Sequence, residues 1–119
     1  MGIKDFDVLC HILLYCSQIT ETSNDFCNSK ERFFGSVTFR NAICLCLLQI
    51  GELVTNLSDD FKINNTEIPW REIKLLRNIV AHRYGHVDFE IVWEILITDI
   101  PKITNFCKRL VDEQREYLV

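Results

Sequence analysis

The stretch SVTFRNAICLCLLQIGELVTN occupies residues 36–56 and predicts the central helix of the fold. Its apolar side chains recur at spacings of three and four residues, which places them along one broad helical face; they are Ala42, Ile43, Cys46, Leu47, Ile50, Leu53 and Val54. Ser36 is the expected N-cap, because a serine hydroxyl can accept a hydrogen bond from the first helical turn. Gly51 costs a helix roughly 1 kcal/mol relative to alanine. We therefore expect another helix to approach closely at Gly51.

The N-terminal third predicts one long helix, over residues 4–20, followed by a connection. The helix carries an apolar stripe at spacings of three and four residues, made by Phe6, Leu9, Leu13, Cys16 and Ile19. Residues 21–35 are rich in Thr, Ser, Asn and Asp. This composition predicts a long, partly irregular connection, and we expect Phe33 and Phe34 to attach it to the core.

The C-terminal half predicts three further helices after a second polar connection at residues 57–68; they cover residues 69–84, 88–98 and 101–117. Pro69 and Pro101 suit the first turns of two of these helices, where the missing N–H has no intrahelical partner to lose. Gly85 suits a helix end, and Asp88 is the expected N-cap of the short helix that follows it.

The predicted fold class is all-α, an antiparallel bundle of four to five helices in one domain over residues 1–119. A length of 119 residues lies within the usual range of roughly 100 to 200 for one domain. A hydrophobic content of 48% supports a real core and argues against disorder. Only four Gly and two Pro are present, which favours long helices over many short strands.

Charge and hydropathy patterns predict a soluble, cytoplasmic protein with no membrane partner. The formal net charge is −4, so any contact with nucleic acid would have to come from a local basic group. Charged residues interrupt the N-terminus where a signal peptide would be apolar. The most apolar stretch, residues 42–50, is shorter than the roughly 20 residues that cross a bilayer.

The six cysteines are predicted to be buried, reduced structural thiols. They lie at Cys10, Cys16, Cys27, Cys44, Cys46 and Cys107. No pair has the C-x-x-C spacing of a zinc knuckle or redox motif. Three of them lie in apolar runs, where a free thiol behaves as a small hydrophobe. No metal site is therefore predicted.

Functional side chains concentrate in residues 77–84, at the end of the predicted third helix. On a helical wheel of about 100° per residue, one arc is apolar and must face the core; it holds Ile73, Leu75, Leu76, Ile79 and Val80. The opposite arc holds Lys74, Arg77, Asn78, Ala81, His82 and Tyr84. Arg77 and His82 are about 140° apart on this wheel, so one helix does not bring them together.

The charge around this segment is locally positive. Arg71, Lys74, Arg77 and Arg83 outweigh Glu72, which gives a formal charge of +3 in an acidic chain. A basic group beside a His and a Tyr suits a phosphodiester. A structural interpretation is also open, because Arg and His near a helix end often complement the helix dipole. Tyr84 would then be a half-buried aromatic residue with its hydroxyl at the surface.

The string RNIVAHRY at residues 77–84 resembles the R-x4-H-x-Y signature of HEPN domains, specifically those of HepT-type toxins. Ile50-Gly51-Glu52, Ile68-Pro69-Trp70, Val87-Asp88 and Val92-Trp93 resemble that family's elements in the same order. The resemblance extends from about residue 33 to residue 101.

The resemblance implies an all-α homodimer whose two R-x4-H motifs face each other across a cleft, cleaving RNA without metal or cofactor. It implies that His82 is the acid/base for attack of an RNA 2′-hydroxyl, a role that suits an unperturbed pKa near 6.5. Arg77 would hold the phosphate and stabilise developing charge. Asn78 would support Arg77, and further RNA contacts are expected from Lys74, Arg71 and Arg83.

The same resemblance implies a partner that switches the enzyme off. The antitoxin of such systems is a minimal nucleotidyltransferase that transfers AMP from ATP onto the Tyr of H-x-Y, here Tyr84. A phosphate-bearing group beside Arg77 would block the cleft and compete for the Arg77 charge. RNA is the implied substrate, and no DNA partner is expected.

Two alternatives to this interpretation remain open. The chain could be a non-catalytic HEPN subunit that binds a nucleotidyltransferase or a nucleotide, or a purely structural helical dimer. A complete R-x4-H-x-Y favours the enzyme, because a scaffold has no need for His82. The sequence leaves the roles of Glu52 and His86 unassigned, and also the RNA target and any assembly beyond a dimer.

Overall fold

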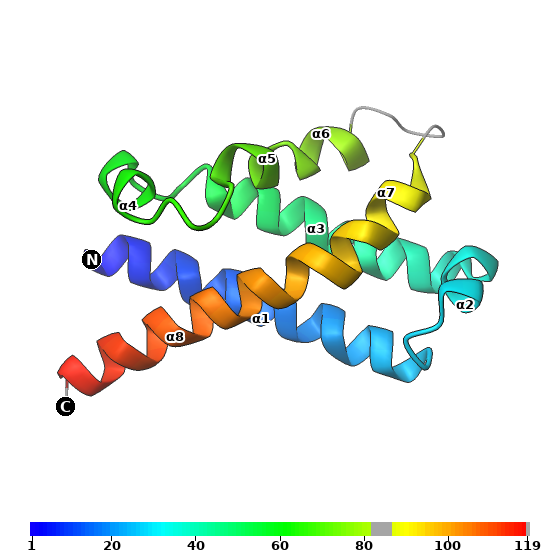
Figure 1. The fold of residues 1–119 in the computed structure, drawn as a ribbon, viewed down its shortest axis with the longest axis horizontal. Helices are drawn as coiled ribbons and strands as arrows, with labels where there is room; N and C mark the ends of the chain where they lie inside the picture. Colours follow the sequence, from blue (N-terminus) through cyan, green and yellow to red (C-terminus); the bar gives the residue numbers. More distant parts are fainter. Residues whose placement is uncertain (82–86, 119) are drawn as a thin grey trace.

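The computed structural model describes residues 1–81 and 87–118, and all regular elements within them are helices. Helix α1 (Ile3–Asp25) runs antiparallel to α3 (Val37–Val54), and the short α2 (Lys30–Gly35) joins them (Figure 1). The chain returns through α4 (Asp59–Asn64), α5 (Trp70–Lys74) and α6 (Leu76–Ala81). It then runs back through α7 (Phe89–Glu94), the π-helical η1 (Ile95–Asp99) and α8 (Ile100–Leu118). The predicted all-α antiparallel fold is confirmed.

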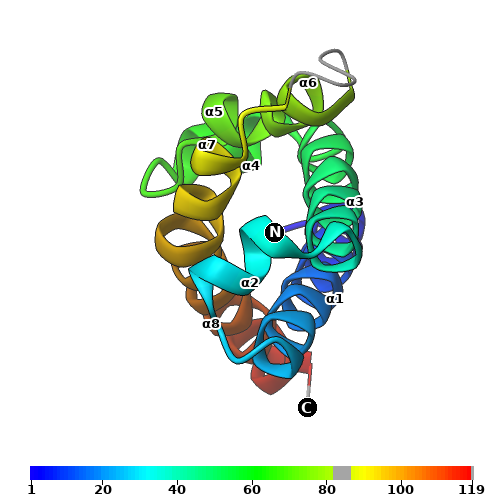
Figure 2. The same cartoon turned by 90° about the vertical axis from the view of Figure 1, so that its right-hand side faces the viewer.

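The end-on view shows how the helices surround one core (Figure 2). Helices α1 and α3 form one side, the α7–η1–α8 segment forms the other, and α5 and α6 lie across the top. Helix α1 packs against both α3 and α8, whereas α5 and α6 pack mainly against α3. Helix α3 is therefore the element to which the segment from α5 to α6 is attached.

Helix α3 is the central helix that the sequence predicts. The Ser36 hydroxyl accepts a hydrogen bond from the Phe39 backbone N–H at 3.1 Å, which confirms the expected N-cap. Ile43, Leu47 and Ile50 on the predicted apolar face are completely or almost completely buried. The hydrophobic pattern of this segment therefore places its buried face correctly.

Length and composition alone would allow α3 to cross a membrane. Its 18 residues have a mean hydropathy of 1.4, and 44% of them are buried inside the structure. The central helix of a water-soluble bundle has the same composition, because it faces apolar neighbours on several sides. Here α3 packs against α1, α2, α5 and α6.

The connection predicted over residues 21–35 is mostly helical, which corrects that expectation. Helix α1 continues to Asp25, and α2 begins at Lys30 with the Ser29 hydroxyl accepting from the Arg32 N–H. Only a tight turn separates them, in which Cys27 and Asn28 have positive φ angles of 60° and 51°. The polar side chains of this region belong to exposed helical faces and caps. A polar composition therefore does not indicate an irregular backbone here.

Phe33 fixes the corner that α2 makes. Its ring is completely buried and meets the rings of Phe39 on α3 and Phe89 and Trp93 on α7, at centroid distances of 5.1, 6.2 and 5.4 Å. The attachment predicted for Phe33 is confirmed. Phe34 is 38% exposed; its ring makes an edge contact with Phe33, and its backbone carbonyl accepts a hydrogen bond from Arg40 of α3.

A second aromatic cluster closes the opposite corner, where a polar connection is predicted at residues 57–68. Phe61 of α4 packs against Trp70 of α5 and Phe106 of α8. Ser58 caps α4 and is itself held by Asp5, whose two carboxylate oxygens accept from the Ser58 N–H and hydroxyl at 2.8 and 2.7 Å. This connection is therefore a capped helix tied to α1.

The last two predicted helices form one continuous rod (Figure 1). Asp88 caps its start by accepting from the Glu90 and Ile91 N–H groups, as predicted. Pro101 does not open a separate helix but lies in the first turn of α8, directly after the π-turn of η1. Proline removes one helical hydrogen bond and crowds the carbonyl four residues earlier. A wider π-turn relieves that conflict without ending the helix.

The segment from α5 to α6 approaches α3 closely at Gly51, as the cost of a glycine in a helix predicts. A Cβ atom at this position would lie 3.0 Å from the Arg77 backbone nitrogen, 3.2 Å from the Arg77 Cβ and 3.4 Å from the Ile73 carbonyl oxygen. Two of these three atoms belong to the backbone, so a larger residue could be accommodated only by moving α6 away from α3.

The cysteines are all free, and most are at least half-buried. Cys16, Cys46 and Cys107 lie in the core, while Cys10 and Cys44 are half-buried. Burial raises the pKa of Cys16 to about 11 and that of Cys107 to about 12. Cys27 is exposed, which corrects the expectation that all six are buried structural thiols.

Replacement of Gly51 by alanine should destabilise the protein. Alanine gains about 1 kcal/mol in helix propensity, but the crowding against α6 should cost more, because overpacking typically costs about 1–3 kcal/mol. We expect a net loss of about 1 kcal/mol in the free energy of unfolding, measured by urea titration. Gly35→Ala is the matched control, because no heavy atom lies within 4 Å of the added Cβ. A Gly51→Ala protein as stable as Gly35→Ala would contradict the close approach.

Thiol reactivity should follow the burial of the cysteines. The thiolate is the reactive form, and the raised pKa values of Cys16 and Cys107 keep both protonated at pH 8. We expect an aromatic disulfide reagent to modify Cys27 rapidly in the native protein, and Cys16 and Cys107 only after unfolding, as mapped by mass spectrometry. Cys27→Ser should remove the rapid phase. Early modification of Cys16 in the native protein would show that the core is open.

Candidate functional site

The segment that carries the candidate site is two short helices with a turn between them. Leu75 lies between α5 and α6, and the Asn78 N–H donates to the Leu75 carbonyl at 2.9 Å, a bond between residues three apart. Such a bond tightens the turn relative to an α-helix. The single regular helix predicted for residues 69–84 is therefore interrupted.

This interruption changes which residues of the predicted helix face the core. Ile73 and Leu76 are buried and Val80 is half-buried, as expected. Leu75 is 46% exposed, so its assignment to the core-facing arc is wrong. A wheel of uniform pitch does not allow for the tightened turn at Leu75, which rotates the residues that follow it.

Arg77 lies against α3, although the wheel placed it on the arc opposite the core. Its backbone nitrogen and Cβ are the atoms that approach Gly51 most closely. Its side chain extends outward to Glu52, and the Arg77 Nε and Glu52 Oε1 atoms are 2.5 Å apart. The two side chains are 46% and 44% exposed. Arg77 thus has a fixed backbone and a side chain at the molecular surface.

Glu52 is the partner that sequence reasoning left unassigned. It follows Gly51 directly in α3, so the residue that permits the close approach and the residue that binds the arginine are neighbours. The only sequence signal for this pair is the Gly51-Glu52 dipeptide, and no local spacing rule relates it to Arg77. The pairing depends on how α6 packs on α3.

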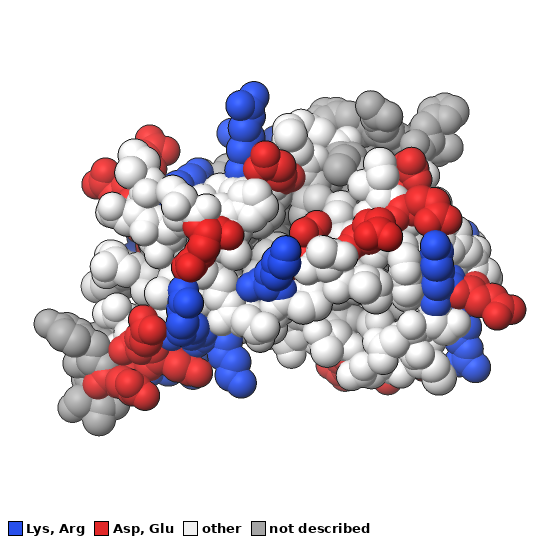
Figure 3. Space-filling view, in the orientation of Figure 1, with Lys and Arg blue, Asp and Glu red and all other residues white. Residues whose placement is uncertain are grey.

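The described residues that are predicted to contact RNA or to support Arg77 lie at the surface. Arg71 and Lys74 on α5 and Asn78 on α6 are all exposed. Figure 3 shows basic side chains over α5 at one edge of the molecule and acidic side chains along α7 and η1; the acidic residues of α7 and η1 are Glu90, Glu94 and Asp99. The charge of Arg77 is offset by Glu52, so the basic group is weaker than the sequence suggested.

Several candidate residues lie outside the described residues. His82, Arg83 and Tyr84 are among them, as are the predicted helix end at Gly85 and the additional His86. Their roles and their distances from Arg77 therefore stay predictions from the sequence.

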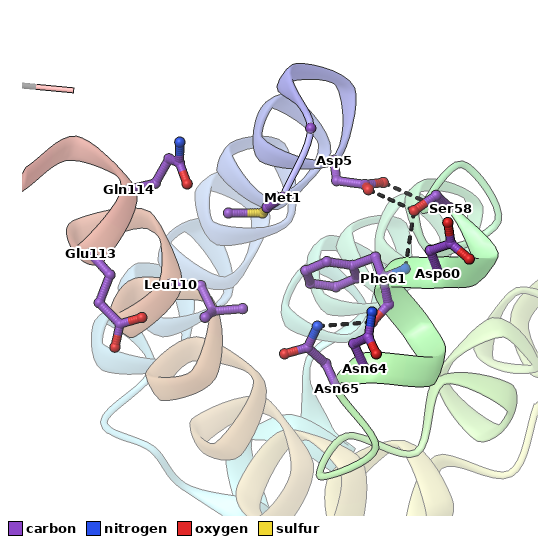
Figure 4. A pocket seen from close by; sticks show the side chains of 11 residues that line it. Met1, Asp5, Ser58, Asp60, Phe61, Asn64, Asn65, Leu110, Glu113 and Gln114 are labelled. Carbon is purple, nitrogen blue, oxygen red and sulfur yellow. Dashed lines mark hydrogen bonds between the residues drawn. The ribbon is translucent and has the colours of Figure 1, made fainter. Parts of the chain in front are cut away.

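A cavity of about 680 Å³ lies at the end of the bundle that holds both termini. Its walls come from the start of α1, from α4 and from the last turns of α8 (Figure 4). Carboxylates and amides of Asp60, Asn64 and Glu113 line it, and Asp5 at its wall is bonded to Ser58. Carboxylates repel a phosphate, so this cavity does not suit the phosphodiester chemistry inferred from the sequence.

Within residues 1–81 and 87–118, no group of three or more His, Cys, Asp or Glu side chains is placed to hold a metal ion. The described part of the site thus consists of an arginine held by a glutamate, with two further basic residues on the preceding helix. This arrangement can bind an anion and stabilise negative charge.

Three relatives have sequences similar to the whole bundle or most of it. "Putative RNase MJ1380" of Methanocaldococcus jannaschii is 35% identical over 95 residues, which are 80% of this chain and 85% of the relative. "Probable ribonuclease HepT" of Thermococcus cleftensis is 33% identical over 84 residues, which are 71% of this chain and 69% of the relative. "Gamma-glutamylcyclotransferase and putative RNase MJ0434" of Methanocaldococcus jannaschii is 32% identical over 111 residues. This chain spans about half of the length of that third relative, at 49%.

No solved structure gives a significant match to the chain. Residues 12–110 match the family described as Ribonuclease HepT-like, a range that includes Gly51, Glu52, Arg77 and the whole R-x4-H-x-Y string. The resemblance to HepT-type proteins noted in the sequence is thereby confirmed. The chain belongs to the ribonuclease HepT-like family.

Proposed function

We propose that this protein is a metal-independent endoribonuclease, the toxin of a toxin–antitoxin pair, with its active site shared between two copies of the chain. The observation that carries the proposal is the complete R-x4-H-x-Y string at residues 77–84, within the range that matches the ribonuclease HepT-like family. The printed names of the relatives support ribonuclease activity. RNA is the substrate, and the cytoplasm is the expected site of action.

In this proposal His82 moves protons and Arg77 stabilises charge. His82 takes the proton of an RNA 2′-hydroxyl, and the 2′-oxygen forms a bond to the adjacent phosphorus. The bond from phosphorus to the 5′-oxygen then breaks, and that oxygen takes up a proton, which leaves a 2′,3′-cyclic phosphate and a 5′-hydroxyl. The Arg77 guanidinium stabilises the negative charge that builds on the phosphate oxygens. Asn78 supports Arg77, and Arg71, Lys74 and Arg83 bind neighbouring phosphates.

A homodimer would complete the site. Leu45 precedes Glu52 by seven residues, so the two lie nearly in line on α3. Leu45 is apolar and 58% exposed. It lies on the same face of α3 as Glu52, which pairs with Arg77. A second copy packing over this line would cover Leu45 and bring two R-x4-H motifs toward one cleft. This geometry overcomes the angular separation of Arg77 and His82 on one helix.

Tyr84 is proposed as the site at which the activity is switched off. A minimal nucleotidyltransferase antitoxin would transfer AMP from ATP to the Tyr84 hydroxyl, with release of pyrophosphate. The attached phosphate would be attracted to Arg77 and would exclude the RNA phosphate by charge and by bulk. His82 would then serve cleavage, and Tyr84, two residues later in the sequence, would serve regulation.

Purified, unmodified protein should cleave a bulk cellular RNA pool in the presence of EDTA. His82→Ala and Arg77→Ala should each lower the cleavage rate by at least about a hundredfold, because each removes a group that acts in the transition state. Intact mass should be measured first, so that AMP on Tyr84 does not mask the activity. Absence of cleavage by verified unmodified dimer would favour the non-catalytic binding subunit. Cleavage that survives both substitutions would indicate a contaminant or another site.

AMP transfer should depend on one tyrosine. With the nucleotidyltransferase of the same system and labelled ATP, the wild-type protein should gain label and lose ribonuclease activity. Tyr84→Phe should take up no label and should stay active in the presence of the antitoxin. Tyr15→Phe is the control, because it removes a half-buried hydroxyl on α1. Undiminished labelling of Tyr84→Phe would exclude this residue as the acceptor.

A further inference from the structure

The ion pair between Glu52 and Arg77 places a carboxylate against one side of the guanidinium. The Glu52 carboxylate meets Arg77 at Nε, with 2.5 Å between Nε and Oε1. Nε is the donor nearest the backbone, so the carboxylate occupies the inner side of the guanidinium. The Nη1 and Nη2 groups form the other edge, whose N–H donors match two oxygens of one phosphate.

Two consecutive residues of α3 therefore set the position of Arg77. Gly51 lets the Arg77 backbone lie against α3, where any Cβ would crowd it. Glu52 then holds the side chain that extends from this fixed backbone. Without the carboxylate, a half-exposed arginine would sample many rotamers and would lose entropy on binding phosphate.

The Arg77 guanidinium is the group that attracts the phosphate. The Glu52 carboxylate offsets part of that positive charge at every stage of the reaction, so any gain from Glu52 must come from the direction it gives to the guanidinium. The attraction grows as negative charge builds on the phosphate oxygens in the transition state. An interaction that strengthens along the reaction raises kcat, whereas uniform binding lowers only KM.

We propose that Glu52 is a positioning residue of the ribonuclease, which holds Arg77 through Nε so that the Nη1–Nη2 edge faces the phosphate under attack. This inference rests on the proposed function for the reaction itself. Glu52 touches neither the RNA nor the reacting atoms in this assignment, and it acts only through Arg77.

The structure supplies a matched control for the loss of an ion pair. Glu67 and Arg109 are also joined, at 2.6 Å, and their side chains are 53% and 52% exposed. Glu67 precedes α5 and Arg109 belongs to α8, so this pair involves neither α3 nor α6. Exposed pairs of this kind contribute little to stability. Glu52→Ala and Glu67→Ala should therefore leave the thermal midpoint almost unchanged.

Steady-state kinetics on a defined RNA should separate the two pairs. Glu52→Ala should lower kcat by about tenfold to a hundredfold with a smaller change in KM, because a misdirected catalytic group can cost about 100-fold. Glu52→Gln keeps the size of the side chain and an oxygen beside Nε but removes the negative charge, so it should retain more of kcat than Glu52→Ala. Glu67→Ala should behave as wild type. A Glu52→Ala protein indistinguishable from Glu67→Ala would overturn the inference.

A double substitution tests whether Glu52 acts through Arg77. Glu52→Ala should have no further effect in an Arg77→Ala protein, because the group it positions is already absent. Independent, multiplicative losses in the double variant would mean that Glu52 has another role, and the positioning assignment would be wrong.

Nitrogen-15 NMR of the arginine Nε–H groups keeps the inference testable without catalysis. The Arg77 Nε–H should be rigid in wild type and mobile in Glu52→Ala. A 2′-O-methyl RNA oligonucleotide, which lacks the attacking hydroxyl, should shift the Arg77 signals in wild type. If wild type does not cleave RNA but shows this rigidity and shift, the ribonuclease proposal fails and the positioning of Arg77 toward phosphate stands. A mobile Arg77 Nε–H, or no shift with the oligonucleotide, would refute the positioning itself.

Discussion

The close contact of α6 with α3 at Gly51 is the constraint on which the rest of the molecule depends. The segment from α5 to α6 packs mainly against α3, so this contact determines where Arg77 lies. The carboxylate of the neighbouring Glu52 contacts the Arg77 guanidinium at Nε. Aromatic clusters around Phe33 and Phe61 close the two corners of the bundle and hold the remaining passes of the chain in place.

Features of the fold that depend on local chemistry could be predicted from the sequence. The apolar face of α3 and the N-caps at Ser36 and Asp88 follow from spacing and residue type, and all three are confirmed. Helices α2 and α4 are not predicted from the sequence, because each has only six residues and shows no helical periodicity. Their stability comes from distant partners, such as the ring contacts of Phe33 and the bonds between Asp5 and Ser58, which no local pattern reveals.

The candidate site was located by its motif, but its geometry depends on contacts between helices. Arg77 and Glu52 are 25 positions apart in the sequence, and the packing of α6 on α3 alone brings them together. The helical wheel failed at Leu75 because one bond between residues three apart changes the local pitch. The roles of His82 and Tyr84 stay predictions, supported by membership of the ribonuclease HepT-like family.

The π-turn at Ile95–Asp99 determines how the buried face of α8 is rotated relative to the buried face of α7. A π-turn holds about one residue more than an α-helical turn, and one residue corresponds to about 100° of rotation. Without it, the side of α8 that carries Ile103, Phe106 and Cys107 would turn away from the core while Val92 and Trp93 stayed buried. The extra residue rotates the apolar face of the helix by about 100°. One unbroken helix can therefore bury apolar side chains on both sides of the π-turn.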